Sequence, residues 1–267
     1  MRAIVWAWLV SLLLAMAPAM AAPTVLRAVG DNWCPYNCNP DASQQGYMVE
    51  LVRAALLPDV KLIYRLEPWT RAVDSVSRGE DDLLLATTHE TTPDLLLGKP
   101  LGVDRTCFFV SARSKWQYRT SNDLADVRLG VIQDYKYDAD GPLDRMIAAA
   151  VASRSGRIDV AAGDDALRLN FRKLAGGRVD VVVENENVGA YALRQLKLRR
   201  AIRSAGCLDY YLGTVHVGIA RTHPQAQAII DVIDRHVDEL RRRKQLAPLM
   251  QRYGLTDWFP LLKTATP

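Results

Sequence analysis

Along the first hundred residues, stretches with the apolar pattern of a strand alternate with stretches whose apolar residues have helical spacing. This order predicts strands that alternate with helices. Apolar residues predominate at 25–29, fill 83–86 and alternate with polar ones over 60–66, and each of these patterns is typical of a strand. Apolar positions recur at helical spacing over 48–56 and again over 68–79. The resulting order, β-α-β-α-β, predicts a sheet covered by helices.

A similar alternation restarts further along the chain. We expect strands at 107–110, 127–132, 158–162, 179–183 and 215–220, and helices at 143–151, 167–174, 226–240 and 246–253. No stretch rich in glycine and serine separates the two units. We therefore expect two lobes joined by strands, with a cleft between them in which a small ligand binds.

The first residues have the pattern of a secretory signal peptide. Arg2 precedes an apolar run at 4–15, and small residues follow up to Ala22. We expect residues 1–21 to be removed by cleavage after Ala21, with cleavage after Ala22 as the alternative. The apolar run is short for a membrane span, and no later segment approaches that length. The mature protein is therefore expected to be soluble and exported to the periplasm.

Composition and charge narrow the classes of partner. Charged residues make up 24% of the chain and hydrophobic residues 49%, which is typical of a folded domain rather than a disordered one. The net charge of +4 is too small to indicate nucleic-acid binding. The basic run at 241–244 lies near the expected end of a helix, where cations oppose the helix dipole.

Signatures of the common enzyme classes are missing from the sequence. It contains no G-x-S-x-G elbow, no phosphate-binding G-x-x-x-x-G-K-[ST] loop, no G-x-G-x-x-G fingerprint and no H-E-x-x-H zinc motif. The four histidines are scattered without the spacing of metal ligands. His89 follows the expected buried strand at 83–86, where either a ligand contact or a plain loop role is open. We expect no metal and no cofactor.

Four cysteines lie outside the expected signal peptide. Cys34 and Cys38 are separated by three residues, which is not the C-x-x-C of a redox centre, and no further zinc ligands lie nearby. An exported protein forms disulfides by default, so a structural staple is the favoured interpretation. Four cysteines allow three pairings, and spacing alone does not choose among them.

The ordered series of segments resembles the family 3 bacterial extracellular solute-binding proteins, which serve uptake transporters for polar amino acids. The segment GYMVEL at 46–51 is similar to the start of the first helix of that family, and 68–82 to its second helix and third strand. Segments 124–133, 174–191 and 217–224 are similar to the entry into the second lobe, a helix-strand-helix unit and the return strand. The likeness spans nearly all of the expected mature chain.

This resemblance implies an α/β fold of two lobes, the type II periplasmic-binding-protein fold, with two crossing hinge segments. We place the crossings at 111–115 and 210–214. Lobe one is then 22–111 together with 214–267, and lobe two is 112–213. Ligand binding is expected to close the lobes by a hinge motion.

Two departures from the family pattern bear on the ligand. The arginine that holds the carboxylate of an amino acid in this family corresponds to Asp94, and the aspartate that holds the amine corresponds to Asn185. An aspartate does not replace a bidentate arginine, so an ordinary α-amino acid is a poor candidate. Acidic residues near the expected site favour a cationic or hydroxyl-rich ligand; they are Glu90, Asp94, Asp134, Glu184 and Glu186.

The resemblance also implies a set of ligand contacts and a disulfide pairing. Expected ligand-binding residues are Trp33, Tyr36, Trp69, Thr87, Thr88, His89, Asp94, Gln133, Tyr135, Glu184 and Asn185. Cys107 and Cys207 both lie near the expected crossings in sequence order, so we expect them to pair, leaving Cys34 to pair with Cys38.

These expectations lead to a periplasmic receptor that captures a small polar molecule, functions as a monomer, is not an enzyme and does not bind nucleic acid. The implied partner is the permease of an inner-membrane ABC transporter. One alternative is a dehydratase-like enzyme on the same scaffold, with Glu184 or Glu186 as an acid whose pKa is raised by burial. Another is an accessory or sensor protein that binds a ligand for a different partner.

Overall fold

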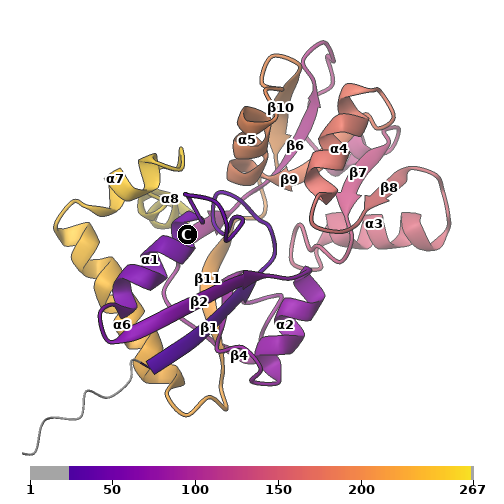
Figure 1. Ribbon diagram of the computed structural model, residues 1–267. Coiled ribbons are helices and arrows are strands. Elements are labelled where there is room, and N and C mark those ends of the chain that lie inside the picture. The colour runs from indigo at the N-terminus through magenta and orange to yellow at the C-terminus, as the bar shows by residue number, and fades with distance from the viewer. Residues whose placement is uncertain (1–23, 266–267) are drawn as a thin grey trace, which may run out of the picture.

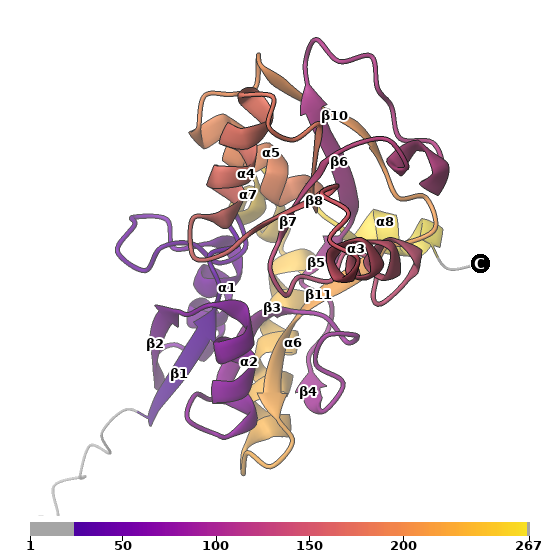
Figure 2. The same cartoon turned by 90° about the vertical axis from the view of Figure 1, so that its right-hand side faces the viewer.

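Two β-sheets organise the chain in the computed structural model, which describes residues 24–265 (Figure 1). The expected signal peptide at 1–21 lies outside the described residues. The first sheet has the order β2-β1-β3-β11-β4, with β5 paired to β11, and the second has the order β10-β6-β9-β7-β8. Figures 1 and 2 place the two groups of strands in opposite parts of the molecule.

The strands of the two sheets come from different parts of the sequence. The first sheet contains β1 (Thr24–Gly30), β2 (Val60–Leu66), β3 (Leu83–Thr87), β4 (Leu95–Leu97), β5 (Gly102–Asp104) and β11 (Gly213–Ala220). The second contains β6 (Thr106–Ser111), β7 (Leu129–Ile132), β8 (Ile158–Ala161), β9 (Val181–Asn185) and β10 (Ile202–Cys207). All five residues of β3 and of β9 are buried, as expected for strands in the interior of a sheet.

Helices cover both sheets. Around the first sheet lie α1 (Tyr47–Leu56), α2 (Trp69–Ser77), α6 (Ala226–Arg242), α7 (Leu246–Gln251) and α8 (Phe259–Ala265). Around the second lie α3 (Pro142–Ala152), α4 (Ala166–Ala175) and α5 (Glu186–Gln195), and a 3-10 turn occupies Ser121–Leu124. The apolar stripe of α6 includes Ile229, Ile230, Ile233 and Val237, all of which are buried. Separate hydrophobic clusters pack around the two sheets, so each has a core of its own.

The strand β6 lies in a different sheet from the one that we expected. The sequence and the family resemblance place it at the end of lobe one, with the crossing at 111–115. In the structure it pairs with β9 and β10, both strands of the second sheet. The chain therefore changes sheets at Arg105 and returns between Cys207 and Gly213.

Between residues 24 and 265, none of the helices is both long and apolar enough to cross a membrane.

Candidate ligand-binding site

A cavity of about 160 Å³ lies between the two sheets. One wall comes from 31–33, which follow β1, and from 68–70 at the start of α2. The facing wall comes from 132–135 after β7, from the loop between β8 and α4, and from Glu184 on β9. A smaller cavity of about 50 Å³ shares Asp31, Trp33, Trp69 and Tyr135 with the first. The site thus lies beyond the carboxyl ends of strands, where open α/β sheets bind ligands.

The loop after β1 holds the indole of Trp33 in this wall. The disulfide Cys34–Cys38 closes the loop, and the backbone N–H of Trp33 donates to the carbonyl of Asn37 over 2.9 Å. The ring of Tyr36 stacks on that of Trp33 at a centroid distance of 4.9 Å. A ring that is fixed before the ligand arrives loses little conformational entropy on binding.

The same loop is seated against the start of α1. The N–H groups of Tyr47 and Met48 donate to the carbonyls of Pro35 and Tyr36 over 2.8 and 2.9 Å. Gly46 has φ +114°, and a Cβ at this position would lie 2.7 Å from the Cα of Asn37. Only glycine combines this backbone conformation with so close an approach, which explains the glycine at the start of the segment GYMVEL.

Glu184 is the most perturbed acid of the cavity. Its Oε1 accepts from the indole Nε1 of Trp33 over 3.2 Å and from the backbone N–H of Asn185 over 2.7 Å. Its side chain is buried, and its Oε2 has no hydrogen-bond partner. Burial raises the pKa of this carboxyl to about 8, so it carries a proton at neutral pH.

Asp31 connects the two walls. The hydroxyl of Tyr135, which lies just after β7, donates to its Oδ2 across the cavity. Burial raises the pKa of Asp31 to about 6, an effect that the hydrogen bond from Tyr135 opposes. Burial also raises the pKa of Tyr135, which therefore remains a donor at neutral pH.

Further hydrogen bonds cross between the same walls. The hydroxyl of Thr70 lies 3.3 Å from Oδ2 of Asp134, and the amide of Asn32 donates to the carbonyl of Asp164 over 3.4 Å. Two more hydrogen bonds, from Trp33 to Glu184 and from Tyr135 to Asp31, cross in the same way. Together the four bonds connect loops of the first sheet to β9 and to the loops after β7 and β8. The two walls therefore stand in direct contact in this conformation.

Asn185 has a structural position at the rim of the site. Its side-chain oxygen accepts from the backbone N–H groups of Asn187 and Val188, so it caps the N-terminus of α5. Its Nδ2 donates to Oδ1 of Asp104 over 2.9 Å. Burial raises the pKa of Asp104 to about 6, and the bond from Asn185 lowers it.

The expected binding residues divide into two groups. Those that line the cavities are Trp33, Trp69, Thr88, Gln133, Tyr135 and Glu184. Those that lie away from the lining are Tyr36, Thr87, His89, Asp94 and Asn185. Tyr36 supports Trp33 from behind, Thr87 is buried and bonds to Thr92 over 2.7 Å, and His89 and Asp94 are exposed.

Several lining residues are absent from the expected set, among them Asp31, Thr70 and Asp164. Asp31 directly follows the first strand, which was a usable signal, because side chains at such strand ends face the ligand site of an open sheet. Thr70 and Asp164 offered no comparable signal, since polar residues are common at the starts of helices and in loops.

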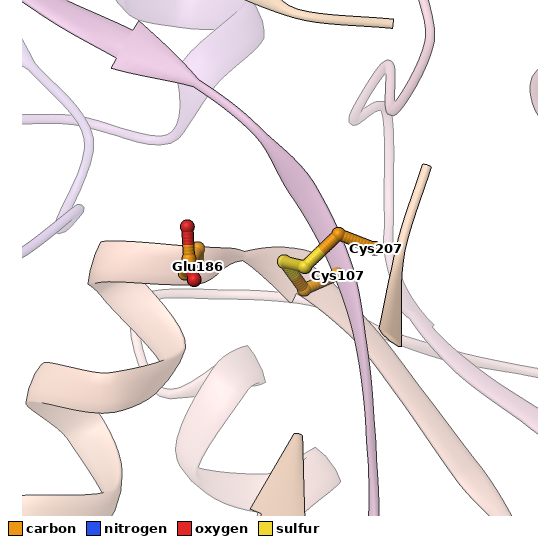
Figure 3. A group of neighbouring side chains, drawn as sticks. All are labelled: Cys107, Glu186 and Cys207. Atoms are coloured by element: carbon orange, nitrogen blue, oxygen red, sulfur yellow. A yellow bond between two sulfur atoms is a disulfide. The ribbon is translucent and has the colours of Figure 1, made fainter. Parts of the chain in front are cut away.

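The two disulfides are Cys34–Cys38 and Cys107–Cys207, which is the expected pairing. Figure 3 shows the carboxylate of Glu186 at the start of α5 beside the bridge between β6 and β10. A metal site at these three residues would need thiolates as ligands, and both sulfurs are already bonded to each other. The oxidised pair is therefore a staple between two strands of the second sheet.

Comparison with known proteins identifies the fold. No family model and no curated protein matches the sequence. A histidine kinase sensor domain that is similar to periplasmic binding proteins matches the structure with a TM-score of 0.69 and 16% identity, over 88% of this chain and 97% of its own. A protein of glutathione import, described with the cystine ABC importer of Streptococcus mutans, matches with a TM-score of 0.70 and 13% identity. The match covers 87% of this chain and 95% of that protein.

A third match is the ancestral amino-acid-binding protein AncCDT-1, described as a precursor of cyclohexadienyl dehydratase. Its TM-score is 0.64 at 13% identity, over 86% of this chain and 95% of its own. At these identities the likeness establishes the architecture, which is the two-lobed type II periplasmic-binding-protein fold. The expected fold class is confirmed, and the resemblance to solute-binding proteins holds at the level of the fold.

Proposed function

We propose that this chain is an exported solute receptor, a divergent relative of the family 3 solute-binding proteins, that captures a small polar molecule between two lobes. Lobe one comprises the first sheet with α1, α2 and α6–α8, and lobe two comprises the second sheet with α3–α5. The observation that carries the proposal is the cavity between the sheets, whose opposite walls both carry polar side chains and are joined by hydrogen bonds. Closing two such walls on a solute is how this architecture binds its ligands.

The architecture of the structural neighbours supports the same conclusion. One is described with an ABC importer and another as an amino-acid-binding protein. We extend to this chain the general role, which is binding of a small molecule for a membrane partner of the ABC importer class. Fractionation by osmotic shock, with N-terminal sequencing of the mature protein, tests the export step and the expected start at Ala22.

The direct test is native mass spectrometry of the purified protein, followed by a thermal-shift screen of small polar metabolites. A ligand at one hundred times its Kd adds roughly 2.7 kcal/mol to the free energy of unfolding, which such a screen detects easily. Trp69→Ala, which alters the cavity wall, is expected to weaken the shift. Trp116→Ala, in a tryptophan outside the cavity, serves as the control and should retain it. A library without any hit, together with a protein that carries no bound molecule, would count against the receptor.

A catalytic role on the same scaffold is the second candidate, and the protonated Glu184 is the observation that favours it. A buried carboxyl with a pKa of about 8 is able to donate a proton to a leaving group at neutral pH. The relation of AncCDT-1 to a dehydratase is in line with such a step. NMR of the bound molecule before and after incubation decides between the two, because a receptor returns its ligand unchanged and an enzyme does not.

The membrane partner is tested separately from ligand binding. A structural neighbour is a kinase sensor domain, so signalling is the alternative to transport. Measuring uptake of the labelled ligand by cells that lack this protein distinguishes transport from signalling. Loss of uptake supports an importer, whereas unchanged uptake with a changed transcriptional response supports a sensor.

A further inference from the structure

Glu184 has a carboxyl oxygen, Oε2, that is not hydrogen-bonded to any of the described residues. The carboxyl is 1% exposed and lines the cavity, its Oε1 takes two donors, and its Oε2 takes none. A buried oxygen without a donor costs free energy unless some group arrives to fill it. Because the side chain of Glu184 lines the cavity, a ligand that enters it is the group that is able to supply the missing partner.

The charges around the cavity select the kind of donor. Four carboxyl side chains line the larger cavity, namely Asp31, Asp134, Asp164 and Glu184, and no lysine or arginine of the described residues lines it. Lys136 lines the smaller cavity, and its ammonium group forms an ion pair with Asp140, which lies outside that lining. A neutral hydroxyl would satisfy the lone oxygen but would leave this excess of acid unbalanced, whereas a cation would offset it.

The same walls disfavour a ligand carboxylate. Asp94, which stands at the position of the family's arginine, is exposed and lies outside the cavity lining. Two helices begin in the lining, α2 at Trp69 and α4 at Ala166, and each offers the positive end of its dipole. In the first turn of α2, the hydroxyl of Thr70 already bonds to Asp134. Asp164 and Asp165 directly precede α4 and already place negative charge there. An amino acid would therefore bring a carboxylate into an acidic cavity without a cation to receive it.

We infer that Oε2 of Glu184 accepts a hydrogen bond from a protonated amine, and that the ligand is a compact organic amine without a carboxylate. This inference rests on the proposed receptor function. Trp33 and Trp69 line the same cavity, and indole rings attract cations. The amine is an N–H donor to an ionised Glu184, so the proton that Glu184 carries in the free protein passes to the solvent on binding.

The ionisation of Glu184 depends on everything that faces it. The surrounding groups are Asp31 and Trp33 after β1, Asp104 on β5, Tyr135 and Tyr137 after β7, and the backbone of Asn185. Burial is the largest cause of the raised pKa, and the charges of Asp104 and Asp31 add to it. A bound cation opposes all three effects. At pH 7 the binding of one amine should therefore release close to one proton.

The experiment uses pairs of probes that differ by one carboxylate. Agmatine, putrescine and histamine are titrated calorimetrically beside arginine, ornithine and histidine, at pH 7 in phosphate and in Tris. We expect at least one amine to bind at least 100-fold more tightly than its parent amino acid. The difference in apparent enthalpy between the two buffers should correspond to release of about one proton.

Two variants separate the anchoring role from a structural one. Glu184→Gln keeps the shape but places an amide where Oε2 accepts, and should weaken amine binding by roughly 10- to 150-fold, the range for a hydrogen bond to a charged group. It should also abolish the proton release. Glu186→Gln is the control, because that side chain is exposed and pairs with Arg105 outside the cavity. It should leave both quantities unchanged.

Two sets of outcomes overturn the inference. It is wrong if none of the three amines binds, or if the parent amino acids bind as tightly. It is also wrong if Glu184→Gln binds the amine unchanged. In either case a different small molecule found by native mass spectrometry, bound in the same cavity, would leave the receptor function standing. Failure of the receptor function itself would appear as the absence of any bound or screened ligand.

Discussion

Replacing Glu184 by glutamine is expected to stabilise the ligand-free protein, by an amount that grows with pH. Glutamine keeps the size of the side chain and its Oε1, which accepts from Trp33 and from the backbone of Asn185. What the substitution removes is an ionisable group that the fold holds away from water. The carboxyl at this site therefore lowers the stability of the ligand-free protein, as is common for residues that serve function.

The magnitude follows from the proton that the folded state retains. Burial raises the pKa of Glu184 from 4.5 to about 8, so between these values the folded state holds a proton that the unfolded state has lost. The free energy of unfolding of the wild-type protein then falls by about 1.4 kcal/mol for each pH unit through this window. The penalty is absent below pH 4.5, reaches about 3 kcal/mol at pH 7 and levels off above pH 8.

Urea denaturation of the wild-type protein and of Glu184→Gln, at half-unit steps from pH 4.5 to pH 8.5, measures this difference. Loss of the carboxyl changes the free energy of unfolding by an amount that varies with pH. Any cost of packing the amide in its place is the same at every pH. Glu186→Gln, two residues away on the surface, is the matched control for loss of a carboxyl at an exposed position. A flat difference for Glu184→Gln would refute a raised pKa at this position, and a slope of opposite sign would mean that the folded state prefers the ionised form.

Three further predictions concern the structure around the cavity. Asn185→Ala removes the N-cap of α5 and should lower the free energy of unfolding by about 0.5–2 kcal/mol, measured in urea. Tyr135→Phe should raise the pKa of Asp31 above about 6, because the lost hydrogen bond holds it down; NMR titration of the carboxyl would contradict this with an unchanged or lower value. Cys107→Ala with Cys207→Ala opens a loop of 100 residues and should cost about 5 kcal/mol, and a loss below about 1 kcal/mol in denaturation would argue against the loop-entropy account.

Much of the fold was predictable because the relevant signals are local. The continuous apolar run of β3 and the helical spacing of the apolar residues in α6 are both set by neighbouring residues. The assignment of β6 to a sheet was not local. Its residues are buried almost throughout, and the strands that receive it, β9 and β10, lie about 70 to 100 residues further along the chain. An apolar strand of this kind carries no mark of the sheet in which it pairs.

The candidate site shows the same division. By itself the sequence determined the order of elements, the loop bracketed by Cys34 and Cys38, and a run of acidic candidates that included Glu184 and Glu186. Only the tertiary structure decided between those two acids, because Asn185 ends β9 and caps α5. That change of geometry within two residues buries one carboxyl in the cavity and leaves the other at the surface. Burial depends on the segments that pack around a residue, and those segments come from distant parts of the chain.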